Sequence, residues 1–356
     1  MGVSARELKL GINVATAGSW STSSAVSTAV GAGDGHYLRD DVNLALRRQV
    51  SKEDSATQNF IGMVQVSNYE AIQIQLPMFL HYRDAWQNVL WALALGTGGT
   101  APSQIGATIA YNNTFEPVLN RTNLYATVVR DKSLMFSEIP GVVLNGFEIR
   151  SGEMGRIEID WLGLGDLEKS DSVINTSTQI NALTFPTLGS RFFMKDLIVR
   201  LNSQSGGALG SGDAVKVTAF RLRYEQPMDV KFVGGSPSMI QPLDNGFPSI
   251  SLELTFARYD AASHAFFAAH RDGTRYKGDL IFTGPAIDAT SSYGLKFELP
   301  HLAVMAYDAA FPGQQQAEPK IVLDALSTTS APTGMTGITK PIRVTTTGIA
   351  SGNPFA

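Results

Sequence analysis

The chain has 356 residues, of which 44% are hydrophobic and 17% charged, with a formal net charge of −4 and no cysteine. This length fits two domains of ordinary size, and the acidic balance argues against a basic face that would hold a phosphate backbone tightly. The lack of cysteine excludes disulfides, thiolate zinc sites and cysteine nucleophiles. No apolar run approaches the ~20 residues of a membrane span, and the first residues lack the apolar core of a secretion signal. We therefore expect a globular protein with no membrane partner.

Residues 1–36 are rich in Ser, Thr, Ala and Gly and predict an extended arm or long loop. Within this segment Leu8–Val14 favours a short strand, and Trp20 is suited to anchor the segment on the rest of the protein. An arm of this kind can become ordered on a neighbouring subunit, and the alternative is a terminus without fixed structure.

From Tyr37 onward the first half of the chain shows strand patterns around one helix. Alternating apolar residues predict a strand at Leu38–Arg48, and the polar stretch Ser51–Asn59 predicts an exposed hairpin loop. An apolar stripe predicts a helix over Tyr82–Leu95, which Gly96 ends. The other predicted strands are Ile61–Val66, Tyr69–Phe79, Ala107–Tyr111, Leu124–Arg130, Leu134–Ile139, Val142–Arg150 and Arg156–Leu162.

The second half opens at Arg191 and repeats this alternation. The loop Val233–Pro248 is rich in Gly and Pro and too long for a simple hairpin turn, so we expect it to make contacts. The tail from Ser327 is rich in Thr, Ser and Gly, with one further strand at Pro341–Thr345. The other predicted strands are Phe193–Leu201, Val215–Tyr224, Ser249–Phe256, Tyr276–Phe282, Gly294–Leu299, Ala303–Tyr307 and Lys320–Leu326.

The stretch Ser249–Asp272 passes from a strand period directly into a helical period. Its strand, Ile250–Phe256, alternates apolar and polar residues, and the apolar residues after it recur at helical spacing. The same arrangement occurs earlier, at Ile72–Met78 and in the helix that follows. The two strands are offset by 178 residues and the two helices by 176, which indicates a duplication.

Two further matches extend this duplication. Ser137–Gly141 matches Phe297–His301 at an offset of 160, and each run contains Glu-x-Pro. Arg156–Leu162 matches Lys320–Leu326 at an offset of 164. The sequence therefore predicts a mostly β fold with two tandem antiparallel β-sandwich domains, each with one flanking short helix.

The predicted organisation has five parts. They are an N-terminal arm at residues 1–36, a first domain at 37–175, a linker at 176–190, a second domain at 191–326 and a Ser/Thr-rich tail at 327–356.

The sequence contains no pattern typical of an enzyme. His264 and His270 are six residues apart on a predicted helix and do not share a face well enough to hold a metal. No nucleophile elbow, zinc-protease motif or phosphate-binding P-loop occurs. The two Glu-x-Pro carboxylates, Glu138 and Glu298, favour bonds to backbone amides over catalysis. We predict that the protein is not an enzyme and has no catalytic residues, no cofactor and no metal.

Arg221, Arg223 and Arg258 form the main basic cluster in the sequence. A nucleic-acid site would require more positive charge and exposed aromatic residues for stacking. The acidic overall charge instead favours ion pairs with Glu225, Glu253 or a neighbouring subunit.

The second half resembles the tail tube (major tail) proteins of long-tailed bacteriophages in three runs: FMKDLIVRLN (193–202), DAVKVTAFRLRYEQP (213–227) and PLDNGFPSISLELTFARYD (242–260). Their order is a strand, a strand into a long loop, a Gly-containing turn, an amphipathic strand and a short helix. The first half follows the same plan, and both halves carry the Glu-x-Pro strand. The resemblance covers about Tyr37 to Leu326.

The resemblance implies a structural virion protein, in which barrel-forming tube domains close through neighbouring subunits into rings. Such rings stack into the hollow tail tube through which DNA is delivered, and closure removes free sheet edges. Six tube domains usually make one ring, so three chains with two domains each would form a pseudo-hexameric homotrimer. The implied partners are further copies of the chain, other phage tail proteins, the tape-measure protein and passing DNA that is not tightly bound. The implied location is the tail of the virion, after assembly in the host cytoplasm.

On this interpretation, polar residues of the two matching strands line the lumen: Gln73, Gln75, Ser251, Glu253 and Thr255. Residues of the two predicted loops make contacts between rings: Lys52, Glu53, Asp54, Ser236, Asp244 and Asn245. The arm before Tyr37 is a further candidate for such contacts.

Two alternatives remain. Another tail or capsid component with the same fold, such as a terminator, a baseplate hub or a decoration protein, would not form long tubes. A carbohydrate-binding or hydrolytic β protein would carry exposed aromatic residues on one strand face. Trp86 and Trp91 instead lie five residues apart on a predicted helix and favour core packing.

Overall fold

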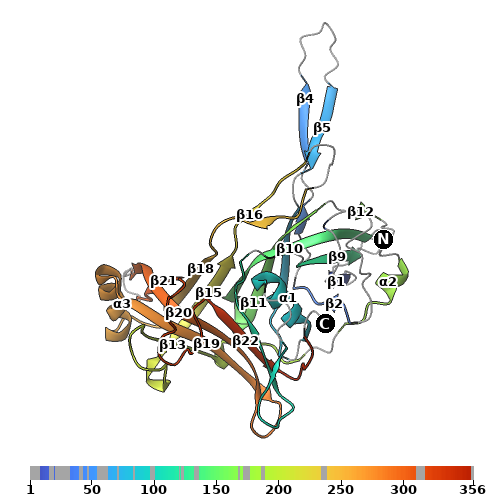
Figure 1. The fold of residues 1–356 in the computed structure, drawn as a ribbon. Helices are drawn as coiled ribbons and strands as arrows, with labels where there is room; N and C mark the ends of the chain where they lie inside the picture. Colours follow the sequence, from blue (N-terminus) through green and yellow to red (C-terminus); the bar gives the residue numbers. More distant parts are fainter. Residues whose placement is uncertain are drawn as a thin grey trace.

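The fold is described from a computed structural model of the chain. The described residues are 9–15, 20, 33–39, 43–45, 48–53, 63–69, 72–82, 85–96, 101–119, 121, 124–131, 136–166, 169–170, 177–185, 189–233, 239–309 and 317–353. As the sequence predicts, the protein is mostly β, and most of its strands belong to one large antiparallel sheet (Figure 1).

The elements of the first half are β1 (Lys9–Ala15), β2 (Gly35–His36), β3 (Asn43–Ala45), β4 (Arg48–Glu53), β5 (Met63–Tyr69), β6 (Ile72–Phe79), α1 (Ala85–Leu95), β7 (Ser103–Gln104), β8 (Tyr111–Phe115), β9 (Tyr125–Asp131), β10 (Phe136–Ser151), β11 (Ile157–Gly165) and β12 (Lys169–Ser170). Those that follow are α2 (Ser177–Asn181), β13 (Leu197–Ser203), β14 (Ala214–Val215), β15 (Val217–Glu225), β16 (Met228–Asp229), β17 (Leu243–Asp244), β18 (Ser249–Phe256), α3 (Ala261–Asp272), β19 (Arg275–Ala286), β20 (Ser292–Asp308), β21 (Lys320–Ala325) and β22 (Arg343–Gly348).

A continuous antiparallel ladder runs through both halves of the chain in the order β3-β6-β11-β10-β15-β18-β21-β20. Its first four strands come from the first half and its last four from the second. The pairing of β10 with β15 therefore joins the two halves through backbone hydrogen bonds (Figure 1).

The long strands β10 and β20 each have a further partner strand along their Glu-x-Pro run. β9 pairs with β10 there, and β19 pairs with β20. The register of β9 with β10 shifts between Ile139 and Val142, and β19 shifts against β20 between Leu299 and Leu302. Such a shift bends a strand and redirects it. Beyond these shifts, β9 pairs with β1 and β19 pairs with β13.

The two halves of the chain share their strand registers, including the positions at which a register shifts. The register of β10 with β11 shifts after Leu144, and that of β20 with β21 shifts after Val304. Corresponding cross-strand pairs are Leu10–Arg130 with Val199–Leu280, Leu44–Ile74 with Leu222–Leu252, and Val142–Gly165 with Leu302–Ala325. The strand plan is therefore repeated at the level of register.

The sequence match between Arg156–Leu162 and Lys320–Leu326 is wrong by four residues. Trp161 on β11 takes the place that Ile321 takes on β21, opposite corresponding residues of β6 and β18. A shift by an even number of residues keeps the apolar side chains on the same face of a strand. The match was based on alternating apolar and polar residues, and this alternation is the same at both offsets.

The strands between residues 37 and 72 also differ from the prediction. The described part of the predicted strand Leu38–Arg48 contains β3 and the first residue of β4, and β4 continues into the predicted loop Ser51–Asn59. β5 runs through Ser67 and Asn68, where we predicted a break, and pairs with β4. Backbone pairing satisfies hydrogen bonds whatever the side chains, so the polar residues Ser51, Ser67 and Asn68 can belong to the two strands of this hairpin. Residues 54–62 lie outside the described residues.

Two strands lie in ranges that the sequence assigned to an arm and a tail. β1 pairs with β9, and β22 pairs with both β20 and β8. Ile342, directly before β22, and Val344, within it, are fully buried. Both segments are therefore parts of the sheet.

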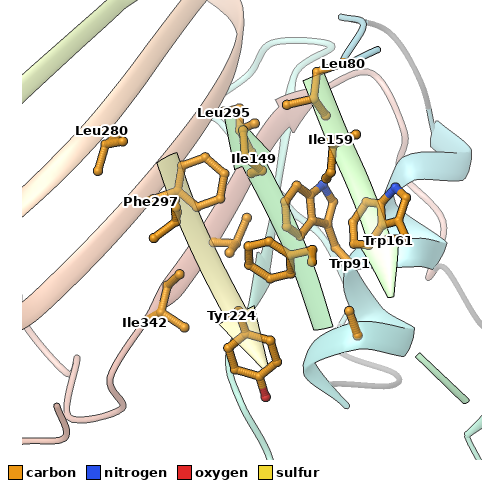
Figure 2. Close-up of a cluster of buried hydrophobic side chains, with 14 of the residues drawn as sticks. Leu80, Trp91, Ile149, Ile159, Trp161, Tyr224, Leu280, Leu295, Phe297 and Ile342 are labelled. Carbon is orange, nitrogen blue, oxygen red and sulfur yellow. The ribbon is translucent and has the colours of Figure 1, made fainter. Parts of the chain in front are cut away.

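One buried apolar cluster extends through both halves of the chain. Trp91 of α1 lies edge-on against Trp161 and Phe147 from the first half and against Phe297 from the second, at ring-centre distances of 4.7 to 5.7 Å. Figure 2 shows Trp91 between the strands with Trp161 and Phe297. Phe147 stacks on Tyr224 across the β10–β15 junction. Aromatic contacts of this kind add to the free energy gained by burial, so the junction is stabilised by side chains as well as by backbone.

His36 on β2 is a buried ionisable group beside this core. It pairs with Leu10 of β1, and its ring Nδ1 donates a hydrogen bond to the carbonyl oxygen of Asp34 at 2.8 Å. Burial lowers the pKa of His36 to about 4, although the hydrogen bond opposes this change.

We predict a loss of stability in mild acid that depends on His36. The unfolded chain takes up a proton near pH 6.5, whereas the folded chain does so only near pH 4. The free energy of unfolding therefore falls as the pH drops through this window, by up to about 3 kcal/mol. Urea unfolding at pH 7 and pH 4.5 measures this fall.

The variant His36→Asn, which keeps a donor for Asp34, should show a smaller fall between these two pH values. Replacement of the exposed His264 by Asn is the matched control and should keep the wild-type fall. An equal fall in all three proteins would contradict the assignment to His36.

Candidate assembly surface

The continuous ladder has one apolar and one polar face. Directly opposed residues on neighbouring strands point to the same side of a sheet. The buried side carries apolar residues such as Ile74, Trp161 and Leu252. The opposite face carries polar and charged residues from six neighbouring strands: Gln73, Gln75, Glu158, Asp160, Glu148, Arg150, Arg221, Arg223, Glu225, Ser251, Glu253, Thr255, Lys320 and Asp324.

Glu148 links the two halves on this polar face. Its carboxylate accepts hydrogen bonds from Arg221 of β15 at 2.6 Å and from Arg150 of β10 at 3.1 Å. Arg150 and Arg221 lie directly opposite each other across the junction. Two like charges in this position would repel each other, and the carboxylate between them offsets this repulsion.

Ion pairs continue from Glu148 over the first half. Arg150 contacts Glu158 at 3.1 Å and Asp160 at 3.2 Å. Arg39 also pairs with Glu158, and its second amino group lies 3.3 Å from Asp160.

The network also extends over the second half. The Glu253 carboxylate forms an ion pair with Lys320 at 2.6 Å and lies 3.7 Å from the Arg221 guanidinium. Arg223 pairs with Glu225 at 2.6 Å. The prediction that this arginine cluster pairs with Glu225 and Glu253 is therefore confirmed for Arg223 and Arg221, whereas Arg258 pairs locally with Asp260.

Neighbouring charges alter the ionisation of the acidic groups on this face. Burial acts to raise the pKa of Glu148, but the hydrogen bonds and charges of Arg221 and Arg150 outweigh it and hold the pKa below its usual range. Burial raises the pKa of Asp160, against the opposing charges of Arg39 and Arg150. The hydrogen bond to Glu148 raises the pKa of Arg221, so this arginine remains charged.

The predicted lumen-facing residues lie on this one face. Gln73 and Gln75 are exposed on β6. Ser251, Glu253 and Thr255 are half-buried on β18. The sequence reading missed five charged residues that lie between or beside them: Arg39, Glu148, Arg150, Glu158 and Asp160. The alternation of the last four of these residues with buried Phe147, Ile149, Ile157 and Ile159 was the available signal.

The residues predicted for contacts between rings lie in two different settings. Lys52 and Glu53 belong to β4, and the β4–β5 hairpin projects away from the sheet (Figure 1). Asp54 and Ser236 lie outside the described residues.

Asp244 belongs to β17 in the long loop of the second half, where it lies opposite Met228 of β16, and Asn245 follows it. Asn245 is exposed. The Asp244 side chain is buried and receives two hydrogen bonds from the Arg121 guanidinium, at 3.2 and 2.9 Å.

Arg121 connects this loop to the first half. Its Nη1 donates to the carbonyl oxygens of Ala94, at the end of α1, and of Leu144 on β10, at 2.7 and 2.8 Å. A cation at the carboxyl end of a helix satisfies carbonyl groups that have no partner in the helix. The loop is thus held on α1 and β10 by one buried arginine.

Trp20 provides a second connection between the same parts of the chain. It is 9% exposed and donates its ring N–H to the Met239 carbonyl oxygen at 3.0 Å. Its ring also meets Tyr125 edge-on. Met239 in turn donates its backbone N–H to Asp166 at 3.3 Å.

Within the described residues, no three His, Asp or Glu side chains lie close enough to hold a metal ion. Glu298 pairs with Lys296 at 2.5 Å, and Glu138 is fully buried. None of the described helices is long and apolar enough to cross a membrane.

We predict that Arg121→Ala lowers the free energy of unfolding by about 3–5 kcal/mol, because it leaves the Asp244 carboxylate buried without its partner. Denaturant unfolding measures this loss. The matched control is Arg271→Ala, which removes an arginine from the exposed pair with Asp272 and should cause no measurable loss. Equal losses for the two variants would contradict a buried tether.

Comparison with known proteins adds no family to this description. No protein-family model matches the chain. A search of curated proteins also finds no match. The geometry of the polar face, the strand junction and the hairpin is therefore the basis for a functional proposal.

Proposed function

We propose that this chain is a structural virion protein that assembles into stacked rings, which form the hollow tail tube that delivers phage DNA. The observation that carries the proposal is the continuous ladder, in which two repeated sets of four strands join through β10 and β15. A sheet that is extended by repeats is suited to further extension by other copies of the chain.

The charge pattern of the polar face supports its role as the wall of the tube. Each of five cations on or beside this face pairs with a carboxylate: Arg39, Arg150, Arg221, Arg223 and Lys320. Phosphate groups bind proteins mainly through free lysine and arginine side chains. A face whose cations are already paired lets DNA pass without holding it.

The β4–β5 hairpin supports the stacking of rings. It pairs with no other described strand and projects from the sheet (Figure 1). Its equivalent in the second half is the loop that contains β16 and β17, which packs on the first half through Asp244. We assign contacts between rings to the hairpin, together with Lys52 and Glu53.

The proposal includes the tandem tube-domain architecture and homotrimeric, pseudo-hexameric rings. It places the protein in the phage tail after assembly in the host cytoplasm. Other tail proteins and the tape-measure protein would be its partners, and the protein would carry out no catalysis. A terminator or baseplate hub is the second candidate, because the same ladder would serve a single ring, but the projecting hairpin favours stacking.

Negative-stain microscopy of the purified protein tests this proposal. We expect rings or tubes of uniform bore. A protein that remains monomeric over a wide range of salt and protein concentration would contradict the proposal.

A second variant separates stacking from ring formation. Replacement of residues 48–69 by a short Gly-Ser linker should leave rings but abolish tubes, because only the contacts between rings are removed. Tubes of normal length from this variant would contradict the role of the hairpin.

A further inference from the structure

The junction between the two halves serves as a template for a second junction. Residues Gly146–Arg150 of β10 pair antiparallel with Arg221–Glu225 of β15, and Glu148 lies opposite Arg223. On its other side β10 pairs with β11, and β15 pairs with β18. The β10–β15 pairing thus joins the four strands of the first half to the four strands of the second half in one ladder.

The registers identify the equivalents of these strands in the other half. β20 corresponds to β10, because both shift register against their partner directly after Leu144 or Val304. Glu148, four residues beyond Leu144, therefore corresponds to Asp308, four residues beyond Val304.

β3 corresponds to β15 by the same reasoning. Leu44 lies opposite Ile74 as Leu222 lies opposite Leu252, and the strands that contain Ile74 and Leu252 are the repeated pair. Arg223, one residue beyond Leu222, therefore corresponds to Ala45.

β3 and the end of β20 lie at opposite ends of the ladder. Among the described strands, β3 has one neighbour, β6, and β20 beyond Ala303 has one neighbour, β21. Met305, on this part of β20, is 54% exposed. Edge strands of this kind are templates for pairing with another chain.

We propose that β20 of one copy pairs antiparallel with β3 of the next copy, with Asp308 opposite Ala45 and Ala309 opposite Leu44. This inference rests on the proposed ring and names the contact that closes it. The occupant of each edge is a second copy of the same chain, because the repeat supplies the same strand at both junctions. Each copy offers one edge of each kind, so the contact is head-to-tail and generates a ring when the rotation closes.

The chain has no cysteine, so introduced cysteines report this contact without background. Directly opposed residues of antiparallel strands have Cα atoms about 4.5–5.5 Å apart, within the range that a disulfide spans. The double variant Ala45→Cys, Asp308→Cys should form disulfides between copies upon oxidation of assembled protein. We expect the monomer band to be lost on a non-reducing gel and replaced by covalent trimers.

Three controls accompany this test. The variant Ile198→Cys, Asp308→Cys should stay monomeric on the gel, because Ile198 is exposed on β13, outside the ladder. A mixture of the two single variants, Ala45→Cys and Asp308→Cys, should give covalent dimers and no larger species. Leu44→Cys with Ala309→Cys tests the same register at the neighbouring pair.

Microscopy of the reduced variants separates failure of the inference from failure of the proposed function. Rings or tubes that give no disulfide at either designed pair would overturn the inference and leave the proposed function standing. Monomers of the wild-type protein under all conditions would overturn both. If one double variant does not assemble when reduced, the disulfide result of the other double variant tests the inference.

Discussion

The backbone pairing of β10 with β15 is the contact on which the rest of the structure depends. Each of these strands has a complete partner on its other side, so the junction turns two short ladders into one. Without it, each strand would present a row of unpaired N–H and C=O groups to solvent. Side chains on both faces support the junction, with Phe147 and Tyr224 stacked in the core and Glu148 between two arginines on the polar side.

The sharing of the core between the halves follows from this junction. Because β10 and β15 are neighbours, the residues behind them join one buried cluster that includes Trp91 of α1 and Phe297 of β20. Arg121 and Trp20 strengthen the connection at the periphery by holding the long loop of the second half on the first. The two repeats form one packed body, although each retains its own strand plan.

The sequence was sufficient for the strand content, for the positions of α1 and α3 and for the existence of the repeat, whereas it did not predict α2. Alternating stretches such as Ile250–Phe256 have one buried face, and that pattern is visible without coordinates. It was insufficient for register, because the four-residue error at β21 leaves every side chain on its correct face. It also missed the partners of Glu148, since ion pairs across strands depend on which strands are neighbours. The sequence predicted a hairpin loop at Ser51–Asn59 but not the full length of β4 and β5, because polar residues such as Ser51, Ser67 and Asn68 do not show the alternation of a half-buried strand.

On the proposed function, copies of this chain extend one sheet into a closed ring. Cryo-electron microscopy of the assembled particle, at a resolution that separates strands, tests it most directly. We expect three chains in each ring, six similar lobes, and an unbroken ladder that passes from β20 of one chain to β3 of the next, with the ion-paired face toward the bore. Rings whose chains meet through other surfaces, with β3 and β20 left as open edges, would contradict it.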